Sequence, residues 1–95
     1  MVFVTKPDFE NAVYAASWPH RIDSDGKDYY IFQLLNDAGL ADPVFYRDMA
    51  LDGSEHIMLT VVKAYMGRRK LKVFLAPKSE GSMRVASVEL GPHIG

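Results

Sequence analysis

A chain of 95 residues is long enough for one hydrophobic core and too short for two, so we expect a single domain over residues 1–95. Hydrophobic residues make up 48% of the chain and charged residues 24%, a balance that excludes an intrinsically disordered protein. The chain has no cysteine, which excludes disulfides and thiolate metal sites. No apolar run suits a signal peptide or a membrane span, so we expect a cytoplasmic protein without a membrane partner.

The N-terminal third begins with a β-prone run at residues 2–4 and then carries a helix signal. Thr5 to Asp8 is typical of a helix start, because it combines capping side chains with a proline at position 7. Apolar residues follow at helical spacing and predict a first helix that ends before Trp18-Pro19: Phe9, Ala12, Val13 and Ala16.

The next segment, residues 23–28, contains an Asp-Gly pair that is also typical of a hairpin turn. The apolar residues after it recur at steps of three and four, which favours a second helix capped by residues 23–25 and stopped at Gly39. They are Tyr30, Ile31, Leu34, Leu35 and Ala38. Asp42-Pro43 then predicts a short third helix over residues 44–50, which ends near Gly53.

The second half of the chain is richer in β-branched residues. Residues 56–66 predict a strand, with a helix begun at Ser54 as the alternative. Residues 71–75 and 83–90 predict two more strands, and residues 78–82 a turn between them. The expected fold class is therefore α+β, with N-terminal helices packed on one face of a C-terminal three- to four-stranded antiparallel sheet.

The two halves also differ in charge. Residues 1–55 hold ten acids against four bases, a net charge of −6, while residues 56–95 hold seven bases against two acids, a net charge of +5. Helix caps and solvated strand faces explain part of this asymmetry. They explain least well the five cations that surround the expected hairpin turn after residue 66, with no acid among them: Lys63, Arg68, Arg69, Lys70 and Lys72.

Two hypotheses follow from this basic hairpin, residues 63–72. In the favoured one, it belongs to a protein-binding surface together with exposed aromatic side chains, or to a homodimer in which the basic and acidic poles meet. The expected partner-binding residues are Lys63, Tyr65, Arg68, Arg69, Lys70, Lys72, Tyr29 and Phe32. In the alternative, the hairpin tracks a nucleic-acid backbone and offers Tyr65 or Phe74 for base stacking; the acidic total charge argues against it.

Residues with catalytic or metal-binding chemistry form only weak patterns. His20 lies near Asp23, Asp25 and Asp28, but the calcium-loop pattern of an EF-hand fails at both ends of this segment. His56 follows Ser54 and Glu55, which on a strand would direct Glu55 and His56 to opposite faces. A small enzyme or metal-binding protein using His20 or His56 is therefore the second alternative, and we expect no catalytic residues, metal or cofactor.

The sequence thus predicts a small non-enzymatic interaction protein. It would act as an accessory, adaptor or inhibitor that docks on another macromolecule, most readily a protein. Small acidic proteins of this kind are common products of phages and other mobile elements.

Overall fold

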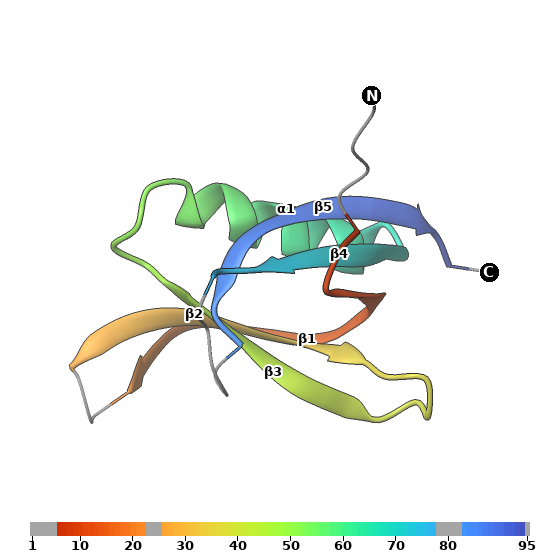
Figure 1. Cartoon of the computed structure of the whole chain (residues 1–95), viewed down its shortest axis with the longest axis horizontal. Helices are drawn as coiled ribbons and strands as arrows, with labels where there is room; N and C mark the ends of the chain where they lie inside the picture. The colour runs from red at the N-terminus through yellow and green to blue at the C-terminus, as the bar shows by residue number, and fades with distance from the viewer. Residues whose placement is uncertain (1–5, 23–25, 78–82, 95) are drawn as a thin grey trace.

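The computed structural model describes residues 6–22, 26–77 and 83–94, without the side chains of residues 17–22 and Asp42. It consists of five strands and one helix in the order β-β-β-α-β-β (Figure 1). Their bounds are β1 Phe9–Ile22, β2 Lys27–Leu35, β3 Ala41–Asp48, α1 Ser54–Met66, β4 Arg69–Leu75 and β5 Val85–His93.

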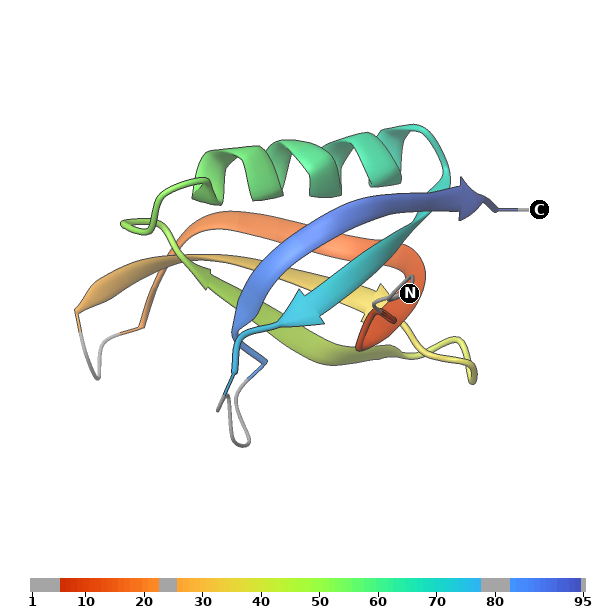
Figure 2. The same cartoon turned by 45° about the horizontal axis from the view of Figure 1, so that its top comes forward.

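The five strands form one antiparallel sheet in the order β3-β2-β1-β4-β5. Strand β1 is long enough to serve two neighbours, because its residues 9–12 pair with β4 and its residues 13–22 pair with β2. At the far edges, Tyr46 of β3 forms a parallel bridge with Arg84, and the Tyr46 amide donates to the Met83 carbonyl over 2.8 Å. The sheet therefore curls into a partly open barrel (Figure 2).

The interior of this barrel is apolar and α1 covers it from one side (Figure 2). Phe32 and Phe45 stack with their ring centroids 5.1 Å apart, and Phe9 meets Phe45 edge to face at the same distance. The helix contributes Ile57, Met58, Val61 and Ala64 to the same cluster. Burial of these side chains supplies the main force that holds α1 against the strands.

The expected N-terminal helices are wrong, because the residues assigned to them form β1, β2 and β3. In β1, Phe9 and Val13 point inward at alternate positions together with Asn11, which is the period of a strand. One extra residue, Tyr14, then bulges from the ladder between Val13 and Ala15 and shifts the alternation. The resulting steps of four and three imitate the spacing of a helix.

The second expected helix is wrong for a different reason. In β2 the inward residues Tyr30, Phe32 and Leu34 alternate as a strand requires. On the other face Ile31 and Leu35 are also apolar and Tyr29 is buried as well, so β2 carries apolar side chains on both faces. A run that is apolar on both faces has no strand period left to detect. The expected helix cap at residues 23–25 lies outside the described residues, and on either side of it Ile22 of β1 pairs with Lys27 of β2.

The strand expected at residues 56–66 is also wrong, and the alternative helix from Ser54 is present as α1. Its buried side chains include Ser54, Ile57, Met58, Val61 and Ala64, at steps of three and four. Tertiary packing of this face outweighs the weak helix preference of its β-branched residues.

The expected strands at residues 71–75 and 83–90 are confirmed in outline by β4 and β5. The second of these begins at Val85 and continues to His93, three residues beyond its expected end. The β-prone run at residues 2–4 and the turn at residues 78–82 lie outside the described residues.

Candidate functional site

A largely apolar hollow lies between α1 and β1, and we call it the α1–β1 groove. It has a volume of about 390 Å³ and is lined by Tyr14, Ala15, Ala16, Val61, Val62 and Tyr65. The first three residues come from β1 and the others from the C-terminal half of α1, which lies along β1 (Figure 2). Its size falls within the range of ordinary ligand and peptide pockets.

The strand side of the groove is built by the sequence Tyr14-Ala15-Ala16. Tyr14 is the bulged residue of β1 and is 55% exposed, so its ring stands at the groove instead of in the sheet. Ala16 pairs with Phe32, a core residue, yet Ala16 itself remains exposed because its methyl group does not reach α1. The two alanines therefore leave the space that forms the groove.

The helix side of the groove continues into an exposed apolar rim. Tyr65 is 57% exposed, and Leu59 and Met66 on the same helix are 54% and 74% exposed. These residues and Val62 share the flank of α1 next to its buried face, since they recur at helical steps. A cluster of large exposed apolar side chains is unusual on a small protein and typically marks a contact surface.

The groove also runs along an open strand edge. Pairing of β1 with β4 stops at Ala12, and beyond it the groove separates β1 from α1. Among the described residues, no backbone hydrogen bond outside the strand ladders reaches Tyr14, Ala15 or Ala16. The main-chain groups of β1 that point away from β2 are therefore not satisfied by another strand at this place.

The five cations expected around a hairpin turn do not form a basic hairpin. Lys63 lies on α1, Arg68 in the turn after it, and the other three on β4. Lys63 and Arg68 are exposed, whereas Arg69, Lys70 and Lys72 are half-buried. They are spread over three elements, so no protruding basic loop results.

Two of these cations face oppositely charged or hydrogen-bonding groups on the neighbouring strands. Lys72 stands directly across from Glu10 of β1 on one side and Glu89 of β5 on the other. Opposite charges in such cross-strand positions attract each other. Arg69 donates from Nε to the Gly91 carbonyl over 2.8 Å. The charge asymmetry of the sequence is thus partly cancelled where β1 and β5 flank β4.

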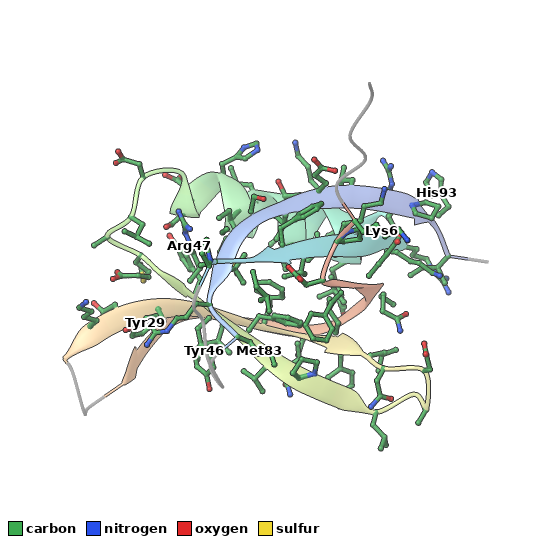
Figure 3. All side chains as sticks on the ribbon, viewed as in Figure 1. Lys6, Tyr29, Tyr46, Arg47, Met83 and His93 are labelled. Carbon is green, nitrogen blue, oxygen red and sulfur yellow. The ribbon has the colours of Figure 1, made fainter. Side chains whose placement is uncertain are left out.

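Tyr29 and Phe32 do not form the exposed aromatic patch that the sequence suggested. Phe32 is fully buried against Phe45, and Tyr29 is 1% exposed. The guanidinium of Arg84 lies 4.8 Å from the centre of the Tyr29 ring, and Tyr46 meets that ring edge to face. Figure 3 shows Tyr29 and Tyr46 on the β2–β3 side of the barrel, with Met83 next to Tyr46.

Of the residues weighed for catalysis, those that the structure describes near Ser54 do not form a catalytic pair. Ser54 is buried and hydrogen-bonded to Arg47, while His56 is exposed on the first turns of α1. His56 lines none of the three hollows found on the described surface. The side chain of His20 and the acids Asp23 and Asp25 lie outside the described residues.

Tyr65 was among the partner-binding residues expected from the sequence, whereas Tyr14, the two alanines and Val62 were not. A signal was present, because Leu59, Val62 and Met66 form a second apolar stripe once residues 54–66 are placed on a helix. The strand side carried no such signal, since nothing local predicts where β4 stops beside β1.

Across the described residues, no helix has the length and apolar character needed to cross a membrane. Comparisons of the chain with protein families, curated proteins and solved structures return no match.

Proposed function

We propose that this protein is a small protein-binding domain whose docking surface is the α1–β1 groove with its rim, Leu59 and Met66. The observation that supports this proposal is the exposure of Tyr14 and Tyr65 in the lining of one apolar hollow, together with the exposed Leu59 and Met66 on the helix that forms one side of it. Tyrosine and methionine are enriched where proteins bind each other, because they give a large contact area. The proposal keeps Tyr65 from the expected partner-binding residues and moves the surface from the cations to the groove.

The decisive test shortens one side chain of the groove and compares the effect on binding with that of a similar change elsewhere on the surface. Tyr65→Ser shortens an exposed side chain in the groove, while Leu40→Ser shortens an exposed side chain in the β2–β3 turn, where Leu40 is 63% exposed. The two variants and the unchanged chain serve as baits for capture from host lysate. Each captured protein is then purified and its affinity for the three baits is measured.

We expect a partner that binds the unchanged chain and Leu40→Ser equally and binds Tyr65→Ser about thirtyfold more weakly. That factor corresponds to about 2 kcal/mol, the contribution of a hot-spot tyrosine. A partner that loses no affinity with Tyr65→Ser would place binding elsewhere on the molecule and contradict the proposal.

A second candidate function is single-stranded nucleic-acid binding on the β2–β3 side of the barrel. A five-stranded, partly open barrel is the architecture of the OB-fold, in which the face of the second and third strands binds oligonucleotides and oligosaccharides. In this chain that side carries Tyr29, Tyr46 and Arg84. This second candidate rests on the likeness to that architecture and not on the chemistry of a site.

Titration of labelled oligonucleotides at low and moderate salt tests the second candidate. We expect binding that weakens steeply with salt and is reduced by Tyr46→Ser, since phosphate contacts release counterions and an aromatic ring stacks on bases. Absence of binding at low salt would remove this candidate and leave the first one untouched.

A further inference from the structure

We infer that the occupant of the α1–β1 groove is an extended segment of a partner protein that pairs with the open edge of β1. This inference rests on the proposed function and specifies the kind of partner. The occupant would add one strand beside Tyr14, Ala15 and Ala16 and place an apolar side chain between the rings of Tyr14 and Tyr65. Such strand addition is one of the recurring ways in which proteins bind peptides.

The main chain of β1 favours an extended occupant. In an antiparallel ladder, successive residues direct their N–H and C=O groups alternately toward one neighbour and then the other. The pairing partner on the α1 side ends at Ala12. The main chain of α1 satisfies itself internally, so the helix cannot replace the missing strand. An extended segment supplies the donors and acceptors that this edge requires.

The shape of the groove also suits an added strand. Three residues of β1 span about 10 Å, which matches three residues of an added strand. Side chains of such a strand alternate, so every second one enters the space above Ala15 and Ala16 while the others face solvent. The expected segment is therefore alternately apolar and polar, and it has no proline at positions that donate to β1.

A helical partner fits these observations less well. Its backbone groups are already bonded within the helix, so the edge of β1 would stay unpaired while the apolar lining was covered. A second copy of this chain paired edge to edge is the other competitor, and the experiment distinguishes it.

The experiment selects ligands with a library of random peptides displayed on phage, using the full chain as target. Ala16→Leu serves for counter-selection, because a leucine at this position fills the groove from the strand side. Leu40→Ser is the matched control outside the groove. Circular dichroism and thermal unfolding establish that each variant folds, and Tyr65→Ser replaces Ala16→Leu if the latter does not.

The selected peptides are then synthesised and measured by calorimetry. We expect alternating apolar residues, and an affinity that falls at least about tenfold with Ala16→Leu and not with Leu40→Ser, since one buried apolar side chain contributes about 1.5 kcal/mol or more. N-methylation of the peptide at alternate residues should abolish binding in one register and leave it intact in the other. The reason is that binding requires only those peptide N–H groups that donate hydrogen bonds to β1.

Each of the other outcomes contradicts one part of the inference. Peptides that lose affinity with Ala16→Leu but tolerate N-methylation in both registers would contradict strand addition while supporting the groove as a docking surface. Peptides that bind Ala16→Leu as well as the unchanged chain, or no enriched peptides, would contradict the groove itself. Self-association in sedimentation experiments that Ala16→Leu abolishes would make a second copy the occupant and overturn the inferred partner segment.

Discussion

Ser54 and Arg47 form the polar junction that connects the end of β3 to the start of α1. The Arg47 guanidinium donates from Nε to Ser54 Oγ over 2.9 Å, and its other nitrogens donate to the carbonyls of Val85 and Asp52. The Ser54 hydroxyl lies 2.7 Å from the Asp48 carbonyl and 2.8 Å from that of Leu51. This junction fixes the position of α1 and therefore the helix side of the groove.

Replacement of this hydroxyl tests the junction. We expect Ser54→Ala to lower the free energy of unfolding by about 1–3 kcal/mol, because Arg47 Nε and two carbonyls lose a partner in a buried position. Ser87→Ala, on the exposed face of β5, removes the same atom and should change stability by less than about 0.5 kcal/mol. Urea denaturation measures both changes, and equal effects would contradict the role of the junction.

Single residues also show why residue type alone misled the sequence analysis. Tyr29 and Tyr65 are the same residue type, yet one is 1% exposed and the other 57%. Tyr29 lies beneath the guanidinium of Arg84, which is 55 positions later in the chain. Tyr65 is on the last turn of α1 and does not belong to the core cluster. Only the contacts between distant segments distinguish them.

At the scale of elements, α1 has two apolar flanks with different roles. One flank, which includes Ile57, Met58 and Val61, enters the core. The other includes Val62, which lines the groove, and the exposed Leu59 and Met66. A helix with so wide an apolar surface is difficult to distinguish from a buried strand by its sequence.

Three alanine substitutions at consecutive positions test the orientation of this helix. We expect Ile57→Ala and Met58→Ala each to cost about 2–5 kcal/mol, because both side chains are buried. Leu59→Ala should change stability by less than about 0.5 kcal/mol, since its side chain is largely exposed. Thermal or chemical unfolding gives the three values. A strand would bury alternate residues, so a similar cost for Ile57 and Leu59 would contradict the helix.

The strands of the barrel show the same limit of local reasoning. The alternation in β4, where Leu71 and Val73 are buried and Lys70 and Lys72 are not, was visible in the sequence. In β1 a bulge interrupts the alternation, and in β2 apolar residues occupy both faces. Local patterns identified the strand with one polar face and failed for the strands whose second face another part of the molecule covers.

For the whole molecule, closure of the barrel joins the two halves of the chain. The bridge between Tyr46 and Arg84 and the hydrogen bond from Arg47 to Val85 connect β3 to β5. β1 belongs to both halves of the sheet, and α1 packs across them. No part of the described core lies outside this one apolar cluster except Tyr29.

This connectivity predicts a single cooperative unfolding transition. Removal of either half would expose the shared core, so neither half should persist alone. Far-ultraviolet circular dichroism, which follows the strands and helix, and near-ultraviolet circular dichroism, which follows tyrosine packing, should give coincident urea curves. Two separate transitions would contradict the shared core and show that the halves fold independently.

The charge asymmetry also changes its meaning at this scale. Along the chain, −6 is followed by +5, which suggested a molecule with two poles. In the fold, β1 from the acidic half lies beside β4 from the basic half, and Glu10 stands across from Lys72. Charges that are distant in sequence become neighbours, so the poles are weaker than the sequence suggests.

The strands β4 and β5 could be predicted in outline from the sequence, because their alternation depends only on neighbouring residues. Contacts between distant segments are what make β1, β2 and β3 strands, make residues 54–66 a helix, and open a groove between α1 and β1. The physical reason is that local preferences here differ by a fraction of a kcal/mol per residue. Burial of side chains against distant partners contributes several times more and therefore selects the fold.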